Sequence, residues 1–141
     1  MPERHAQPIR NVENGVLALD YPVGLESAGG IPAQYVTLSR LFILHAPQSM
    51  RSLELAVAAR CADAAARCAH SLQGAAAAIG GQRLASTAHR LTEAARLQLN
   101  RIEPNQIGPD WTEIDVARDQ LHGELQELIE LLRQTIQTLQ T

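Results

Sequence analysis

The sequence predicts an all-α domain: an antiparallel four-helix bundle with a short N-terminal cap helix. Three observations indicate this fold. Aromatic residues make up 3% of the 141 residues while alanine and leucine are abundant, and β-strands usually draw on aromatic and β-branched residues. Apolar residues recur at spacings of three and four along most of the chain. No β-hairpin signal competes with this pattern.

The N-terminal part divides into a leader and a short helix. Residues 1–19 are predicted to be a flexible leader or linker, because residues 1–15 are polar and rich in Pro and Asn. The helical bundle is expected over residues 20–141. Asp20 could cap a short helix, which Gly29 and Gly30 would end.

The first long helix should begin near Pro32, since proline is tolerated in a first helical turn. Pro47 should break or kink it. The positions that face the core recur at helical spacing on both sides of Pro47, and the series could extend to Cys61: Tyr35, Leu38, Leu41, Phe42, His45, Met50, Leu53 and Val57.

Two shorter helices should follow. One runs from about Asp63, a candidate cap, to Gly80 and Gly81. The next runs from about Gln82 to Asn100. Its apolar stripe is Leu84, Ala88, Leu91 and Ala95, and its wet side carries His89, Arg90, Glu93 and Arg96.

A loop and a long final helix complete the expected bundle. Residues 100–109 are predicted to be the loop, and Asp110 with Glu113 resembles a capping box. The stripe of the last helix is Ile114, Ala117, Leu121, Leu125, Leu128, Leu132, Ile136 and Leu139. The other helices need this apolar face, which favours a core seam over a coiled-coil dimer, so we expect a monomer.

Composition argues against several classes of function. The net charge is −3 and there is no basic run, so no nucleic-acid partner is expected. No apolar run approaches the roughly 20 residues of a membrane span, and no signal peptide is apparent, which favours a cytoplasmic chain without direct membrane contact. Cys61 and Cys68 lack partners at metal-ligand spacing, so no metal site is expected, and both are interpreted as small buried residues.

One histidine lies in an alanine-rich helix whose apolar residues fall on the opposite side. With roughly 100° per residue, the residues far from His70 are Ala65, Cys68, Ala69, Leu72, Ala76 and Ile79. The residues on the side of His70 are Ala66, Arg67, Gln73, Gly74, Ala77 and Gly81. This pattern predicts an imidazole exposed to water among small or polar neighbours, open to a visiting protein.

The run His70-Ser71-Leu72-Gln73-Gly74-Ala75-Ala76, followed by Ile79-Gly80 and Leu84, resembles the signature of histidine-containing phosphotransfer (HPt) domains. The resemblance covers about residues 20–139, and the chain is similar to the C-terminal HPt modules of hybrid sensor histidine kinases. It implies a phosphorelay intermediate of two-component signalling. His70 would accept a phosphoryl group from a receiver-domain aspartate and pass it to a response-regulator aspartate.

The resemblance also implies the partners and the limits of the chemistry. The partners would be receiver domains of a hybrid kinase and of a response regulator. These would hold Mg²⁺, so this chain would need no cofactor. No Walker-type phosphate loop is present, so an isolated domain would be a carrier and not an enzyme. A free-standing protein and a cytoplasmic part of an inner-membrane sensor kinase both stay open.

One position departs from the family pattern. The family commonly has Lys three residues after the histidine, and this chain has Gln73, which brings no charge. Arg67, one turn before His70, could supply the cation. Receiver docking is expected on Ala66, Gly74, Ala77 and Gly81, with the neighbouring helix contributing Leu41, Leu44, His45 and Gln48.

Two other classes of function compete with the phosphocarrier. A docking or adaptor bundle could keep the fold and lose the chemistry, and Gln73 favours that alternative. A helical DNA-binding module is disfavoured by the net charge of −3. A lone histidine on a helix is usually only a solvated surface residue, but the residues around His70 fit one family pattern.

Overall fold

The computed structural model describes residues 12–13, 16–100 and 111–141, and these ranges contain two short strands and five helices. The elements are β1 (Val12–Glu13), β2 (Val16–Leu17), α1 (Tyr21–Ser27), α2 (Pro32–Ala58), α3 (Ala62–Ala78), α4 (Gln82–Leu99) and α5 (Thr112–Gln140).

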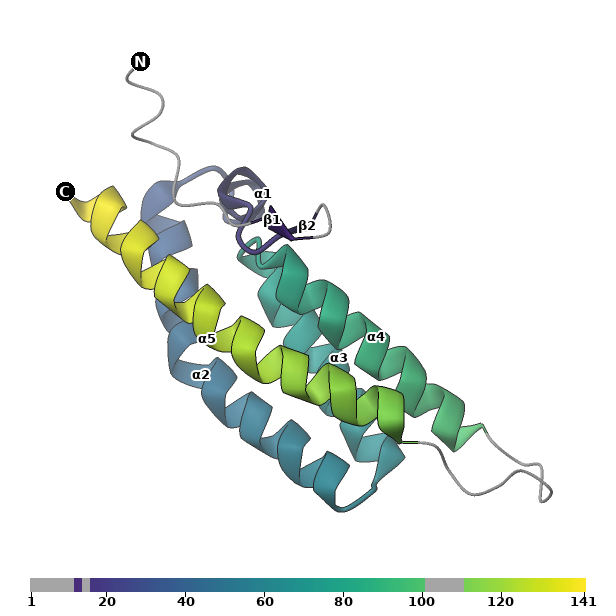
Figure 1. Ribbon diagram of the computed structural model, residues 1–141. Helices are drawn as coiled ribbons and strands as arrows, with labels where there is room; N and C mark the ends of the chain where they lie inside the picture. The colour runs from purple at the N-terminus through teal and green to yellow at the C-terminus, as the bar shows by residue number, and fades with distance from the viewer. Residues whose placement is uncertain (1–11, 14–15, 101–110) are drawn as a thin grey trace.

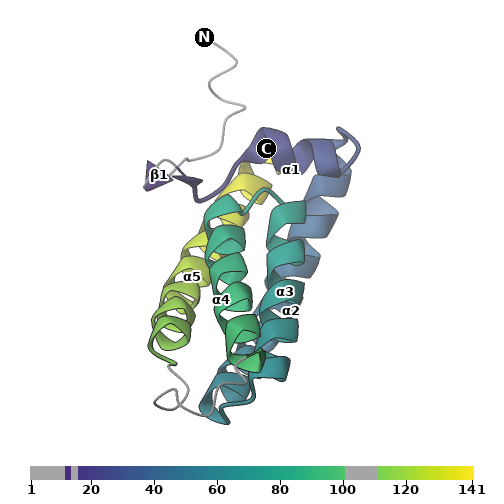
Figure 2. The ribbon, with the colours of Figure 1, turned by 90° about the vertical axis from the view of Figure 1, so that its right-hand side faces the viewer.

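The four long helices form the bundle, and α1 lies across one end of it (Figure 1). Each long helix packs against the next along the chain, and α5 returns to α2 to close the ring. Figure 2 shows α5, α4 and α3 side by side, with α2 behind α3. This arrangement confirms the predicted antiparallel four-helix bundle with its cap helix.

The cap helix α1 is fixed to the turn between α3 and α4. The Asp20 carboxylate accepts from the backbone N–H of Val23 at 3.3 Å, which confirms the predicted N-cap. The Asp20 N–H donates to the Gly80 carbonyl at 2.7 Å. Gly80 has φ +83, and a Cβ there would collide with the Asp20 carbonyl. Gly29 and Gly30, both with φ +77, end α1 as predicted.

The helix α2 begins at Pro32, as predicted, but Pro47 does not break it. Pro47 removes one helical N–H, yet the buried face continues on both sides of it through Phe42, Ala46 and Met50. Packing of this face against the core outweighs the local cost of the proline. The continuation ends at Ala58, so Cys61 does not belong to α2.

The chain joins the core before residue 20. Val12 pairs with Leu17 and Glu13 with Val16 in an antiparallel ladder. Ala18 and Leu19 are 4% and 1% exposed in the core cluster. The expectation of a flexible leader through residue 19 is therefore wrong for Ala18 and Leu19, because their apolar side chains are buried in the core of the bundle. Residues 1–11 and 14–15 lie outside the described residues.

The start of α3 differs from the prediction. The N-cap position is Cys61, which is exposed, and its side chain makes no capping hydrogen bond. Asp63 lies in the first turn and pairs with Arg67 instead. Cys68 is partly exposed, so the expectation that both cysteines are buried is wrong. Both thiols are free.

The predicted stripes of α4 and α5 form the core. Every apolar residue that the sequence assigned to these two stripes is buried except Leu139, which is half-buried. The α5 stripe is thus a core seam. The predicted loop at residues 100–109 and the cap Asp110 lie, except for Asn100, outside the described residues. The N-cap position of α5 is Trp111, without a side-chain capping bond.

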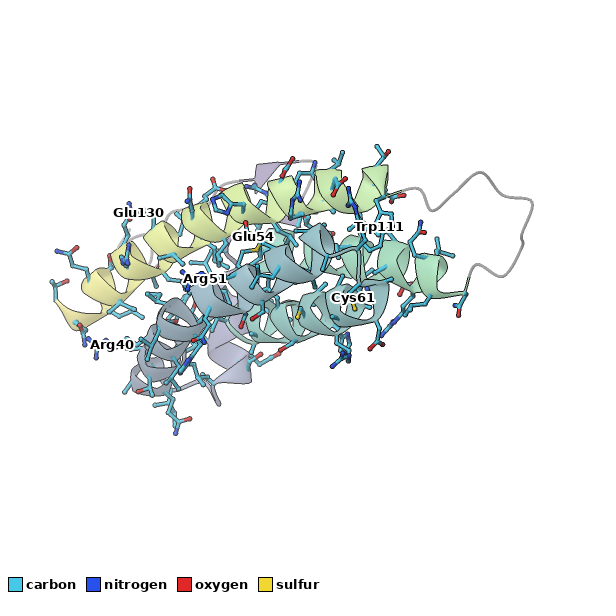
Figure 3. The ribbon with its side chains drawn as sticks, turned by 90° about the horizontal axis from the view of Figure 1, so that it is seen from below. Arg40, Arg51, Glu54, Cys61, Trp111 and Glu130 are labelled. Carbon is cyan, nitrogen blue, oxygen red and sulfur yellow. The ribbon has the colours of Figure 1, made fainter. Side chains whose placement is uncertain are left out.

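Arg60 joins the α2–α3 turn to the start of α5. Its guanidinium carbon lies 5.0 Å from the Trp111 ring centroid, and its nitrogens donate to the Asp115 carboxylate at 2.8 and 3.2 Å. This contact holds the pKa of Asp115 below its usual range. Figure 3 shows Trp111 and Cys61 at the same end of the bundle. In the described parts of the chain, no helix is long and apolar enough to cross a membrane.

Candidate functional site

His70 lies halfway along α3 with its side chain exposed to solvent. The opposite face of α3 is almost fully buried at Ala65, Ala69, Leu72 and Ala76. The predicted orientation of the histidine is therefore confirmed. The small residues on the buried face let α3 sit close to its neighbours, which leaves the imidazole standing clear of the core.

His70 lines a shallow depression between α3 and α4, with a volume of about 350 Å³. The helix α4 contributes Arg96 and Leu99 to this depression, and α3 contributes the rest. The lining residues are Asp63, Ala66, Arg67, His70, Ser71, Arg96 and Leu99. Two guanidinium-bearing side chains from different helices therefore border the hollow that holds the imidazole.

Each of these arginines is held by an acid of its own helix. Arg67 Nη2 lies 2.9 Å from Asp63 Oδ2, and Arg96 Nη1 lies 3.2 Å from Glu93 Oε2. All four side chains are more than half exposed. Ion pairs between side chains as exposed as these contribute little to the free energy of folding.

Sequence reasoning placed Arg96 on the wet side of its helix but did not assign it to the site. It lies 26 residues after His70, and no local spacing rule links two such positions. The signal that could have found it is the antiparallel pairing of the two helices, which brings the last turn of α4 beside the part of α3 from Asp63 to Ser71.

Gln73 does not line the depression, because its side chain is directed to His89, which lies earlier on α4 than Arg96. Its Nε2 lies 3.4 Å from Nδ1 of His89, and the two residues line a separate hollow with Ala77. Its Oε1 is enclosed and has no hydrogen-bond partner among the residues that the structure describes. Gln73 thus occupies the helical position that the sequence indicated, but it is not among the residues that line the depression around His70.

The four expected docking residues divide into two pairs. Gly74 and Ala77 are exposed, and a Cβ at Gly74 would meet nothing within 4 Å. Ala66 is only 6% exposed, because α4 packs against its side of α3. Gly81 is buried, because α3 ends at Ala78 and Gly81 already caps α4 beside Leu128. The expectation that Ala66 and Gly81 are open surface is therefore wrong.

An apolar groove of about 250 Å³ lies on the other side of α3, against α2. Leu41, His45 and Ser71 line it, so it runs close to the histidine. Leu41 is 47% exposed and Leu44, just outside the groove lining, is 69% exposed. The expected contribution of α2 to docking stays a prediction, with these residues in place for it.

No cluster of three or more metal-ligating side chains is present in the described part of the chain. The comparison with protein families gives one finding: the model of the Hpt domain family matches residues 37–140. This range includes α3, α4, α5 and most of α2. No curated protein and no solved structure matches the chain.

Proposed function

Because this chain belongs to the Hpt domain family, whose members transfer phosphoryl groups in two-component signalling, we propose that His70 is its phosphoacceptor. In this proposal His70 takes the phosphoryl group from an aspartyl phosphate of one receiver domain and passes it to an aspartate of a response regulator. One observation carries the proposal: the His70 imidazole is exposed halfway along a helix whose other face is buried.

The reaction needs an unprotonated imidazole nitrogen as the nucleophile. That nitrogen attacks phosphorus, the bond from phosphorus to the aspartyl oxygen breaks, and the aspartate leaves as a carboxylate. Phosphoryl transfer depends mostly on positioning and on neutralisation of charge, so the carrier needs little machinery of its own. The receiver would supply Mg²⁺, and this chain would need no cofactor.

Docking in this proposal uses both sides of the histidine. Gly74 and Ala77 leave the helix backbone accessible to a receiver loop. The apolar groove beside Leu41 would take apolar side chains of the receiver. Ala66 would contribute only as the floor of the depression, and Gly81 would not contribute. The partners would be cytoplasmic receiver domains, and the carrier would act as a monomer.

Phosphate transfer from a labelled receiver tests the proposal. The chain is incubated with a phosphorylated receiver domain and Mg²⁺, and acid-labile, base-stable label on the chain is measured. Wild type should carry label and His70→Gln should carry none. His122→Gln is the matched control, since His122 is exposed on α5. Label that survives His70→Gln would move the acceptor to another residue.

An adaptor without chemistry is the second candidate, and Gln73 in place of lysine favours it. This candidate predicts that receivers bind the chain, as measured by calorimetry, while wild type gains no label from any of several cognate receivers. Binding without label would replace the phosphocarrier proposal with the adaptor.

A further inference from the structure

We propose that Arg96, reaching from α4, contacts the phosphoryl group on His70 and, with Arg67, supplies the positive charge that Gln73 lacks. This inference rests on the proposed role of His70 as phosphoacceptor. It assigns to a second helix part of a task for which α3 offers Arg67 and, at the position where the family commonly has lysine, only the uncharged amide of Gln73.

Gln73 is a poor candidate for this task. A primary amide carries no charge, and charge-assisted hydrogen bonds are roughly twice as strong as neutral ones. Its Nε2 is also directed to His89, 3.4 Å away, and its Oε1 is enclosed. Turning the amide toward His70 would give up that contact.

Arg96 is suitably placed. It lies in the last turn of α4 and borders the same depression as His70 and Arg67. The two arginines come from different helices, so they approach the hollow from two sides. A guanidinium presents a planar fork of N–H donors that matches the oxygens of a phosphoryl group. Both side chains are more than half exposed, so only their ion pairs with Asp63 and Glu93 would have to break for them to turn.

The acids that hold the arginines give the site two states. Without phosphate, Asp63 and Glu93 pair with Arg67 and Arg96 at 2.9 and 3.2 Å. A phosphoryl group carries close to two negative charges and three acceptor oxygens. It would therefore attract both guanidinium groups away from the singly charged carboxylates. The same carboxylates would oppose the arrival of the phosphoryl group, so removing one should favour transfer.

Phosphorylation by potassium phosphoramidate tests the inference without a partner protein. The imidazole nitrogen attacks phosphorus, the P–N bond breaks, and the amide nitrogen leaves as ammonia with a proton. The rate of phosphohistidine formation is followed by ³¹P NMR at low salt. We expect Arg96→Ala to slow it about tenfold, the loss of one hydrogen bond to a charged group. Arg96→Lys should restore most of the rate, and Glu93→Gln should raise it about twofold, the effect of one exposed charge.

Arg133→Ala is the matched control. Arg133 is an exposed arginine on α5 that is also near an acid three residues away, Glu130. Its loss changes the net charge equally and should leave the rate unchanged. Circular dichroism melting of every variant separates a loss of fold from a loss of contact. The ³¹P chemical shift of the phosphorylated protein should depend on salt in wild type and less so in Arg96→Ala.

Two results would count against the inference in different ways. A folded Arg96→Ala variant that gains phosphate as fast as wild type, or no slower than Arg133→Ala, overturns the role of Arg96 while His70 keeps its own. Wild type that gains no phosphate on His70 from either phosphoramidate or a receiver overturns the proposed function, and the inference with it.

Discussion

Tyr35 is a fully buried phenol whose hydroxyl donates to the carbonyl of Ile79 at 2.8 Å. This bond ties the start of α2 to the end of α3. Burial raises the pKa of Tyr35 well above its ordinary value. Because the fold favours the protonated phenol, its contribution to stability is fully present below pH about 10 and is lost as pH rises beyond that value.

Tyr35→Phe should therefore have two effects. At pH 7 it should lower the free energy of unfolding by about 1 kcal/mol, because a buried hydrogen bond is lost. Above pH 10 the variant should lose less stability than wild type, because it has no buried phenol to ionise. Urea unfolding at pH 7 and at pH 11 measures both. An equal alkaline loss in the two proteins would show that Tyr35 is not the group responsible.

At the scale of the secondary-structure elements, most of the helices could be predicted from the sequence. Their apolar periodicity and flanking Pro and Gly residues gave starts at Pro32 and Gln82, as observed. The break expected at Pro47 does not occur, because a local rule does not count the burial of the α2 face on both sides of it, while the alternative of a kink stays a prediction. The cap at Asp63 failed as a prediction: Cys61 holds the N-cap position of α3, and its side chain makes no capping bond. The expected cap at Asp110 lies outside the described residues.

Alanine substitutions at two helical glycines, Gly74 and Gly123, would distinguish an effect on folding stability from an effect on receiver docking. A Cβ at Gly74 of α3 or at Gly123 of α5 would meet nothing within 4 Å. Replacing either by alanine should raise the free energy of unfolding by about 0.5–1 kcal/mol, because alanine favours the helix. Only Gly74→Ala should also slow phosphoryl transfer from a receiver, since only Gly74 lies near His70. Slowing by both variants, or by neither, would contradict the docking role of Gly74.

At the scale of the whole molecule, Ala18 and Leu19, which precede α1, belong to the core of the bundle. Leu19 is 1% exposed, so Leu19→Ala should cost about 3 kcal/mol of the free energy of unfolding, as other large-to-small core changes do. Leu44→Ala is the control, because Leu44 is 69% exposed and should cost less than about 0.5 kcal/mol. Thermal unfolding measures both. Similar melting temperatures for the two variants would place Leu19 outside the cooperative unit.

The periodicity of a single helix predicts only part of the candidate site. His70, Gly74 and Ala77 were correctly placed on the open side of α3 from the 100° rotation per residue. Ala66 was misplaced because α4 covers it, and Gly81 because the helix ends first. Arg96 was missed for the same reason: its nearness to His70 arises from the packing of two helices. Such residues become predictable only once the pairing of elements is known.

The order of the helices around the ring has a kinetic consequence. Within the described residues, each of α2, α3 and α4 packs against the helix that follows it. The pairing of α2 with α5, together with smaller contacts of α1 with α3 and of β2 with α4, joins distant parts of the chain. A folding chain therefore closes mostly short loops, which gives it a low relative contact order. Helical proteins of this kind refold on the order of microseconds to milliseconds. A domain of this topology recovers from transient unfolding quickly, with little time for its leucines to meet those of another molecule.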